Sequence, residues 1–155
     1  MKKLVSLLII CASVVGATVS VFAYSDTDNS SYKSSIDELS QLGIINGFED
    51  GTFKPQENVT RAQAATMFAA ALGYSDTKYK NIATDNAVFS DFTMSHWAYK
   101  YADYIMKSAD ISSGETNCIL SGFEDGTFRP DNNVTIIQLL KMAICSLGED
   151  GYMAE

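Results

Sequence analysis

An arginine in this chain directly follows a helix-capping residue, a position that suits it to binding an anion. Thr60 and Gln63 have the spacing of a capping box, which predicts Arg61 at the first helical position. Free backbone amides and the positive end of the helix dipole would lie beside it. A guanidinium can hold a carboxylate through two charge-assisted hydrogen bonds, so an acidic ligand suits this position. The alternatives are a solvated charge or an ion pair with Glu57 or Asp50.

A second group with chemical potential surrounds the single tryptophan and the single histidine of the chain. Trp97 either packs in the core beneath a helix or presents a flat face on which a sugar ring can stack. Asp91 and His96 can exchange hydrogen bonds with sugar hydroxyls. The alternative for these two residues is that they cap the start of the helix.

Two Asp-Gly pairs, Asp50-Gly51 and Asp125-Gly126, raise the question of a calcium loop. With Gly51 at the sixth place of such a loop, the third place falls on Phe48, which cannot ligate a cation. The second copy fails at its first, third and twelfth places, which fall on Ser121, Phe123 and Asn132. We therefore expect turns, with no metal and no cofactor.

Catalysis finds little support in the sequence. There is no Gly-x-Ser-x-Gly segment and no cluster of metal-ligand residues. Two carboxylates at a cleft could hydrolyse a glycoside, and the 19 acidic residues offer candidates for such a pair. The recognisable acids nevertheless belong to turns and caps, so we expect a binding protein and not an enzyme.

The elements that position these residues come from a repeat. The stretch from Gly47 to Thr60 returns 75 residues later as Gly122 to Thr135, and Thr135 with Gln138 again has capping-box spacing. Behind each cap an apolar face recurs at helical spacing, and a glycine stands at the expected helix end. The matching positions are Ala65, Phe68, Ala69, Leu72 and Gly73 in one copy, and Leu140, Ala143, Ile144, Leu147 and Gly148 in the other.

Each of these helices should be preceded by another. In the first copy we expect a helix from Ser34 or Ser35 to the stop at Gly43. In the second we expect a helix over 95–108. Its apolar side would consist of Trp97, Ala98, Tyr101, Ala102, Ile105 and Ala109.

Together these residues resemble the S-layer homology (SLH) domain. The first copy carries the resemblance in 24–26, 43–44, 47–55, 59–62 and 72–73, and the second in 89–91, 96–98, 122–130, 134–135 and 147–148. The resemblance implies a mainly α fold of two SLH repeats, each a helix, an Asp-Gly-Thr-Phe turn and a second helix, within a pseudo-threefold arrangement.

The resemblance also implies a ligand. In such families the arginine that matches Arg61 contributes to grooves that bind pyruvylated secondary cell-wall polysaccharide, whose pyruvyl ketal carries a carboxylate. The His-Trp-Ala segment, here 96–98, lies at the rim of a groove. Ile136 and Ile137 replace Arg-Ala in the second copy, so we expect at most one strong arginine-centred site per chain.

The predicted domain organisation begins with a secretory signal over 1–23, although a retained membrane helix is an alternative for this apolar run. SLH repeat 1 follows over 24–74, a linker over 75–88, and SLH repeat 2 over 89–148 with an insertion near 112–120. The tail over 149–155 resembles the start of a further repeat.

Charge and cysteine content restrict the partners. The formal net charge of −8 becomes −10 when the signal takes Lys2 and Lys3 with it, which argues against nucleic acid and anionic membranes as partners. Cys118 and Cys145 remain in the exported chain, and the sequence leaves open whether they form a disulfide.

We therefore expect a secreted, cell-wall-associated module that anchors non-covalently by binding an anionic polysaccharide. Its contacts would be Arg61, Trp97, Asp91 and His96. The alternative is a structural module that pairs with other SLH-bearing chains and binds no glycan itself. On this view Arg61→Ala should sharply reduce co-sedimentation with the wall and leave the helical signal and the melting temperature nearly unchanged.

Overall fold

The computed structural model describes residues 24–80, 87–108 and 118–147, and there the chain consists of helices and turns. The helices are α1 (Lys33–Gln41), α2 (Arg61–Ala71), α3 (Asp76–Lys80), α4 (Tyr99–Ser108) and α5 (Ile136–Ser146). Strand pairing in these ranges is limited to isolated bridges, Thr60 with Asn133 and Phe89 with Phe92. The mainly helical prediction is confirmed, whereas the pseudo-threefold arrangement remains a prediction.

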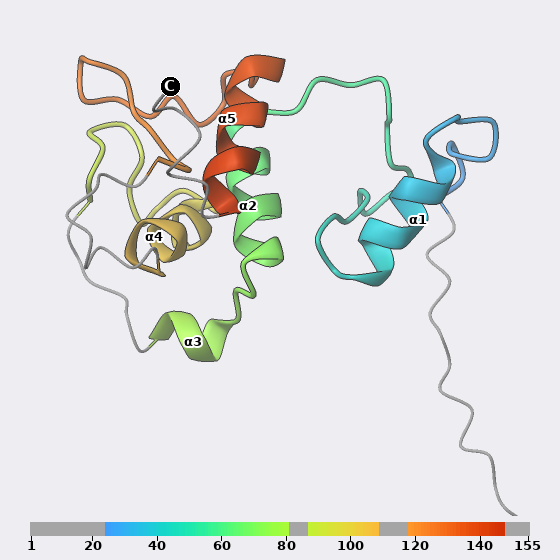
Figure 1. The fold of residues 1–155 in the computed structure, drawn as a ribbon, viewed down its shortest axis with the longest axis horizontal. Helices are drawn as coiled ribbons and strands as arrows, with labels where there is room; N and C mark the ends of the chain where they lie inside the picture. The colour runs from blue at the N-terminus through green and yellow to red at the C-terminus, as the bar shows by residue number, and fades with distance from the viewer. Residues whose placement is uncertain (1–23, 81–86, 109–117, 148–155) are drawn as a thin grey trace, which may run out of the picture.

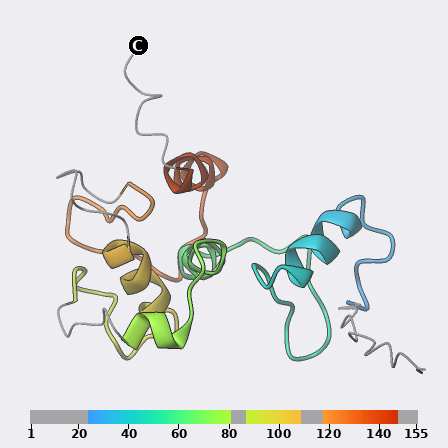
Figure 2. The same ribbon diagram turned by 60° about the horizontal axis from the view of Figure 1, so that its bottom comes forward.

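Helix α2 lies at the centre of the molecule, with α4 and the short α3 on one side and α1 on the other (Figures 1 and 2). We call residues 24–55, which include α1, lobe 1, and the described part of 89–130, which includes α4, lobe 2. The ribbon of lobe 1 lies to one side of the other helices in both views and is joined to α2 by an extended stretch, and the Met67 side chain of α2 packs against the lobe. Helix α5 lies beside α2 and makes contacts with it.

An aspartate clamps the Asp-Gly turn of each lobe by the same pair of bonds. The backbone amides of Phe53 and Lys54 donate to Asp26 at 2.8 and 2.7 Å. In lobe 2 the amides of Phe128 and Arg129 donate to Asp91 at 2.6 and 2.8 Å. Lys54 and Arg129 both adopt a φ of 57°, which is uncommon for residues with a side chain. The clamp fixes this backbone identically in both lobes.

The interior of each turn is also duplicated. Asp50 accepts hydrogen bonds from the amide and the hydroxyl of Thr52, and Asp125 does the same for Thr127. A side chain at Gly47 would collide with the Tyr24 ring, and one at Gly122 with the Phe89 ring. These contacts confirm that the Asp-Gly pairs form turns.

Both capping boxes are formed as predicted. Thr60 and Thr135 accept a hydrogen bond from the amide three residues on, and the side-chain oxygens of Gln63 and Gln138 accept one from the cap amide. Gly73 ends α2 with a φ of 78°, while Gly148 lies outside the described residues. Helix α4 begins four residues later than expected because Thr93 to His96 form a turn, in which the His96 amide donates to the Thr93 carbonyl.

The main core lies between α2 and lobe 2. Its side chains are almost fully buried. Those that α2 contributes are alanines: Ala62, Ala64, Ala65 and Ala69. Phe92 and Phe128 stack beneath them with ring centroids 4.7 Å apart. Small side chains let α2 approach α4 closely, and the face predicted for α2 is confirmed.

Lobe 1 has a small core of its own. Tyr24, Ile36 and Ile45 are buried there, and Met67 of α2 packs against them. The Tyr24 hydroxyl lies 3.1 Å from the hydroxyl of Ser40 and accepts the Gly47 amide at 3.0 Å. The aromatic side chain that begins this repeat therefore joins α1 to the turn.

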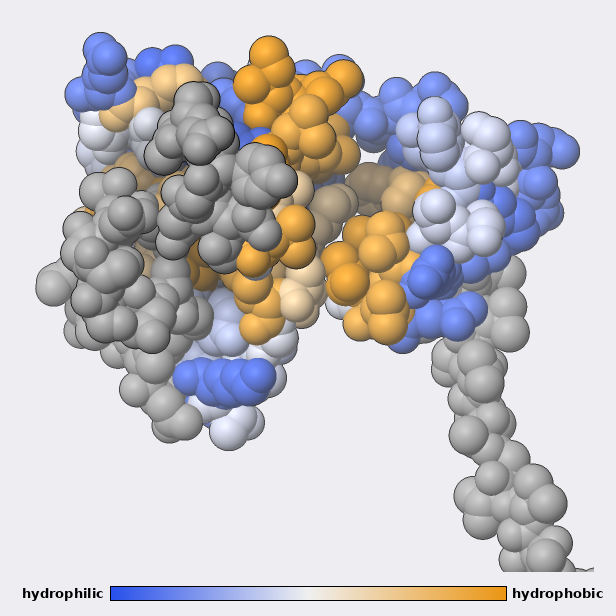
Figure 3. Space-filling model, viewed as in Figure 1, coloured by the Kyte–Doolittle hydropathy of each residue, from blue (hydrophilic) through white to orange (hydrophobic). Residues whose placement is uncertain are grey.

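The predicted apolar face of α5 is wrong as a core face. Leu140, Ile144 and Leu147 are exposed, and Met142 is the residue that α5 buries against lobe 2. Figure 3 shows this hydrophobic surface over α5, with a second hydrophobic area on lobe 1. The repeated pattern predicted a helix correctly, but not what covers it.

The predicted linker contains helix α3. The Tyr79 hydroxyl donates to the buried carboxylate of Asp103 at 3.1 Å, and Lys107 pairs with the same carboxylate at 2.6 Å. Ile82, the other anchor expected in this stretch, lies outside the described residues, as do the signal over 1–23, the tail, and all but 118–120 of the insertion. In the described ranges no helix is long and apolar enough to cross a membrane.

A disulfide joins Cys118, just before lobe 2 turns towards its Asp-Gly pair, to Cys145 near the end of α5. The two Cα atoms lie 5.7 Å apart. Because α5 buries little else than Met142, this bond is a principal attachment of the helix to lobe 2.

Removing the disulfide should cost substantial stability. It closes a segment with a sequence separation of 27, for which chain entropy predicts a loss of about 3–4 kcal/mol in the free energy of unfolding. The measurement is urea denaturation of Cys118→Ser/Cys145→Ser beside the oxidised wild type. Reduced wild type should match the variant, and a variant as stable as the oxidised protein would contradict the role.

Candidate functional site

Arg61 joins the two repeats through its side chain. Its Nε donates to the Phe128 carbonyl and its Nη2 to the Ser121 carbonyl, each at 2.7 Å. The guanidinium carbon lies 4.5 Å from the centroid of the Phe128 ring and 5.0 Å from that of Phe123. Only 7% of the residue is exposed, so the interpretation as a solvated first-turn charge is wrong.

The charge of Arg61 has no carboxylate partner in the described parts of the chain. Asp50, one of the partners considered, pairs instead with Lys54, and both oxygens of the nearby Asp91 accept backbone amides. Burial lowers the pKa of Arg61, the positive charge of Arg129 lowers it further, and Asp91 partly offsets both. An arginine remains protonated under these conditions, so the site keeps a positive charge that carbonyls and ring faces only partly balance.

The N-terminus of α2 does not offer the free amides that the sequence indicated for an anion site. The amides of Arg61 and Ala62 donate to the carbonyls of Asn132 and Pro130 at 2.9 Å each, and the Gln63 amide donates to its cap. With these amides engaged, the first turn of α2 binds the second repeat instead of a ligand. The donor left over at this place is Nη1 of the Arg61 side chain, which makes no hydrogen bond within the described residues.

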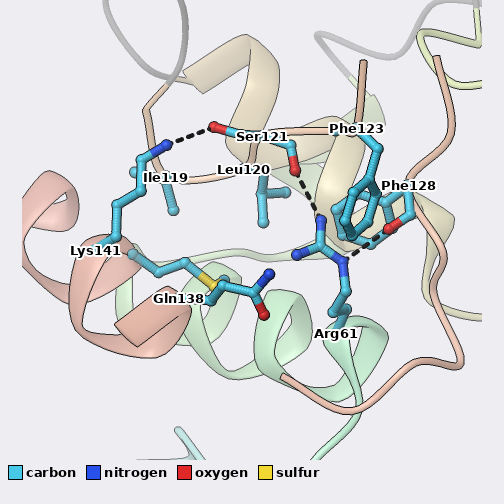
Figure 4. A pocket seen from close by; sticks show the side chains of 10 residues that line it. Arg61, Ile119, Leu120, Ser121, Phe123, Phe128, Gln138 and Lys141 are labelled. Atoms are coloured by element: carbon cyan, nitrogen blue, oxygen red, sulfur yellow. Dashed lines mark hydrogen bonds between the residues drawn. The ribbon is translucent and has the colours of Figure 1, made fainter. Parts of the chain in front are cut away.

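A cavity of about 140 Å³ lies beside that side chain. Arg61 enters it from α2 and Lys141 from α5, with Ser121 between them (Figure 4). The Lys141 ammonium donates to the Ser121 hydroxyl at 2.9 Å. The lining contains two cations and no carboxylate: Arg61, Ile119, Leu120, Ser121, Gly122, Phe123, Phe128, Gln138, Lys141 and Met142. In an acidic protein this is a local positive site.

Sequence reasoning missed Lys141. The signal was available, because Lys141 is the only charged residue in the apolar stretch from Val134 to Leu147. Lobe 1 has no counterpart of this pair of cations within the described residues. Thr66, on the α2 helix of the same repeat, stands where repeat 2 has Lys141. Ile136, on α5, stands where α2 has Arg61. In the described residues the arginine-centred arrangement therefore occurs at lobe 2 alone.

Asp91 does not reach the cavity lining. Its carboxylate is occupied by the amides of Phe128 and Arg129, so it holds the turn and neither caps a helix nor faces a ligand. The turn that it holds carries the Phe128 carbonyl to which Arg61 donates. Asp91 therefore acts on the site through the position of that backbone.

His96 and Trp97 lie around a separate depression, lined by Tyr79, Met94, Ser95, His96, Trp97, Tyr99 and Lys100. Trp97 is 58% exposed, so the expectation that it packs in the core is wrong. His96 packs edge-on against Phe92 at 4.9 Å, and its Nδ1 accepts the Ala98 amide at 3.2 Å, which confirms its role at the start of α4. The four predicted site residues thus fall into three different surroundings.

A family model for the S-layer homology domain matches residues 23–65 and 88–135 of the chain. The chain belongs to the S-layer homology domain family. The two matched segments include both clamped turns, the capping box of Thr60 and Gln63, and the cap residue Thr135, so these shared features of the repeats are those of the SLH domain.

Named relatives share this domain. A surface layer protein of Brevibacillus choshinensis is 28% identical over 96% of the chain, which spans 13% of that protein. A cellulosome-anchoring protein of Acetivibrio thermocellus is 38% identical over 59% of the chain, and the matched segment covers 18% of that protein. An endoglucanase of a Bacillus species is 29% identical over 79% of the chain, and the matched segment covers 11% of that protein. The chain thus covers less than a fifth of each relative, and cell-surface association is what this SLH membership supports.

The turns should be weakened by acid. Hydrogen bonds from Thr127 and Arg129 lower the pKa of Asp125 to about 2, and the amide of Phe53 lowers that of Asp26. Because these folded-state pKa values lie below the ordinary value of 3.8, the unfolded chain binds more protons on acidification. Their contribution to stability is complete above that value and is lost as the pH falls towards about 2.

Thermal melts between pH 5 and about 2 test this expectation. The melting temperature of the wild type should fall across that interval, and Asp125→Asn should show a shallower fall because it removes one titrating group. Glu124→Gln changes a neighbouring acid that holds no turn hydrogen bond in the described residues, and should keep the wild-type slope. Equal slopes for Asp125→Asn and wild type would contradict the assignment.

Proposed function

We propose that this SLH protein anchors non-covalently to the cell wall by binding an acidic secondary polysaccharide, with the acid group received between Arg61 and Lys141. The observation that carries the proposal is the pairing of two cations around a cavity whose lining holds no carboxylate. A pyruvyl ketal on a sugar supplies a carboxylate of the required charge. Anchoring also agrees with the similarity to a surface layer protein and to a cellulosome-anchoring protein.

Arg61 is suited to this role because it is already held in place. Two of its nitrogens are fixed by carbonyl oxygens, and the third, Nη1, makes no hydrogen bond within the described residues. A carboxylate at Nη1 would gain a charge-assisted bond worth about 1.5–3 kcal/mol without first having to order the side chain. Lys141 supplies the second contact from the opposite wall, at the cost of its bond to Ser121.

The cavity is small enough to limit what enters. A cavity of about 150 Å³ accepts a group the size of benzene, so a space of about 140 Å³ receives the acid-bearing part of one sugar residue and not a length of polymer. The polymer would continue over the surface outside. The proposal therefore concerns a terminal or branching acidic sugar.

The depression at Trp97 provides a second contact in this proposal. An exposed indole with Met94 and Tyr79 beside it offers apolar faces to a sugar ring, and Lys100 adds a positive charge. His96 borders the same depression with Nε2, 3.7 Å from Asp131. Asp91 contributes through the turn and not by contact.

The proposal makes the protein a binding module and not an enzyme. The acids of the repeats that sequence reasoning singled out are occupied: Asp26 and Asp91 hold backbone amides, and Asp50 and Asp125 hold threonines. Hydrolysis of a glycoside needs one carboxylic acid and one carboxylate free to act across a cleft. A second candidate, assembly with other SLH-bearing chains, is favoured by the exposed apolar residues of α5.

Co-sedimentation with purified cell-wall sacculi tests the glycan proposal. Lys141→Ala should reduce pelleting by about tenfold or more, because one charge-assisted contact is worth more than 1.4 kcal/mol, and should leave stability nearly unchanged because Lys141 is exposed. Lys33→Ala removes the same charge from α1 and should pellet like the wild type. Sacculi stripped of the pyruvylated polymer should retain none of the three proteins, and undiminished pelleting on them would indicate a protein or peptidoglycan partner.

Arg61→Ala is a poorer test than the sequence suggested. It leaves two carbonyls without their donor and opens space between the repeats, so it should lower the melting temperature as well as wall binding. Arg61→Lys keeps the charge but not the forked geometry of the donors. Its wall binding and melting temperature should therefore lie between those of the wild type and of Arg61→Ala.

Trp97 fluorescence tests the second contact, because this residue is the only tryptophan and is largely exposed. Stacking of a sugar would remove water from the indole, so adding the purified polymer should shift the emission to shorter wavelength and reduce quenching by acrylamide. Trp97→Phe should retain part of the affinity and Trp97→Ala less. An unchanged spectrum at polymer concentrations that saturate pelleting would remove Trp97 from the site.

A further inference from the structure

The second helix of repeat 1 contacts two lobes. Met67 packs α2 onto its own lobe 1, while the alanine face from Ala62 to Ala69 packs onto lobe 2. Backbone bonds accompany the second contact, since the amides of Arg61 and Ala62 donate to Asn132 and Pro130. Helix α2 therefore connects its own repeat to the next one.

Helix α5 repeats only the first of these contacts. Met142, which matches Met67, packs onto lobe 2 in the same way. The face that matches the alanine face of α2 is apolar and uncovered, with Ile136 78% and Ile137 80% exposed. The exposed positions on this face are Ile136, Ile137, Leu139, Leu140 and Ile144, and we call them the α5 face.

The backbone groups that match the contact between repeats are also unused. The amides of Ile136 and Ile137, which match those of Arg61 and Ala62, have no acceptor in the described residues. Lobe 1 shows the complementary condition. Within the described ranges no donor reaches the carbonyls that match the four acceptors in repeat 2, which are those of Asn46, Phe53, Pro55 and Glu57.

The unpaired amides of α5 and the unpaired carbonyls of lobe 1 in the described residues therefore match the two sides of the backbone contact that α2 makes with lobe 2. We propose that the α5 face of one chain docks on lobe 1 of a second copy, in the way that α2 docks on lobe 2 within each chain. Ile136 would meet Phe48 of the second copy, because Arg61 lies over Phe123 and these residues match at the offset of 75. Leu39, Leu42 and Phe48 supply exposed apolar surface on lobe 1.

The distribution of charge also favours lobe 1 of a second copy as the partner of the α5 face. Lobe 1 carries an excess of acidic residues, whereas the only charged residue of α5 is Lys141 and its helix dipole presents positive charge at Ile136. An isologous contact between two α5 helices would bury apolar surface too, but it would leave the α5 amides and the lobe 1 carbonyls unpaired. Pairing with lobe 1 gives the two α5 amides the carbonyls of Glu57 and Pro55, which match the acceptors that α2 uses on lobe 2.

Such a contact is heterologous, because one copy contributes α5 and the other lobe 1. Every pair of chains keeps one free α5 face and one free lobe 1, so association continues until the ends meet in a ring or the chain runs on as a filament. The inference does not depend on the proposed glycan site. Ile136 occupies the position of Arg61, so the new junction adds no arginine-centred site.

The test measures mass in solution by analytical ultracentrifugation over a range of concentration, using the exported protein that begins at Tyr24. Wild type should associate with increasing concentration. Ile137→Glu blocks the α5 face and Phe48→Glu blocks lobe 1, and each variant alone should remain monomeric. Both residues are exposed, so circular dichroism and melting should be unchanged. Val88→Glu places the same charge on an exposed apolar residue of neither surface and should behave as wild type.

Mixing the two variants separates head-to-tail docking from other modes. One intact α5 face and one intact lobe 1 remain in the mixture, so Ile137→Glu and Phe48→Glu together should form a 1:1 dimer and nothing larger. If Phe48→Glu associates as well as wild type while Ile137→Glu does not, the contact is between α5 helices and the proposal is wrong. A wild type that stays monomeric at the highest concentration would also overturn it.

Discussion

The hydrogen bonds from Arg61 to the carbonyls of Phe128 and Ser121 determine how the two repeats sit together. They cross from the first turn of α2 to the turn that Asp91 clamps, so the clamp, the junction and the cavity share the same few atoms. The cost of burying this cation is met by carbonyl oxygens and by the faces of Phe123 and Phe128. Because no carboxylate of the described residues pairs with it, the group that joins the repeats also leaves a positive charge beside the adjoining cavity.

Features fixed within a few residues could be predicted from the sequence. The capping boxes at Thr60 and Thr135, the helix ends at Gly43 and Gly73 and the Asp-Gly turns all depend on local backbone sterics and short-range hydrogen bonds. They recur in both copies because the local residues recur. The family resemblance rests on the same local features, and for that reason it was recognisable.

Features that depend on distant partners could not be predicted in this way. The acceptors of Arg61 lie 60 and 67 residues along the chain, and the amides held by Asp91 lie 37 and 38 residues away. Trp97 follows an apolar helical pattern but stands before α4 begins, in a turn set by Thr93 and His96, so it is exposed. Periodicity likewise indicated that α5 has an apolar face without indicating whether the chain supplies anything to cover it.

The alanine face of α2 makes lobe 2 selective for that helix. Ala62, Ala64, Ala65 and Ala69 lie against lobe 2 with no space around them, whereas the matching residues of α5 are Ile137, Leu139, Leu140 and Ile144. Those branched side chains could not enter a gap fitted to methyl groups, so α5 cannot take the place of α2 on lobe 2. The second helices of the two copies have thus ceased to be interchangeable, although the turns of the two lobes keep the same hydrogen bonds.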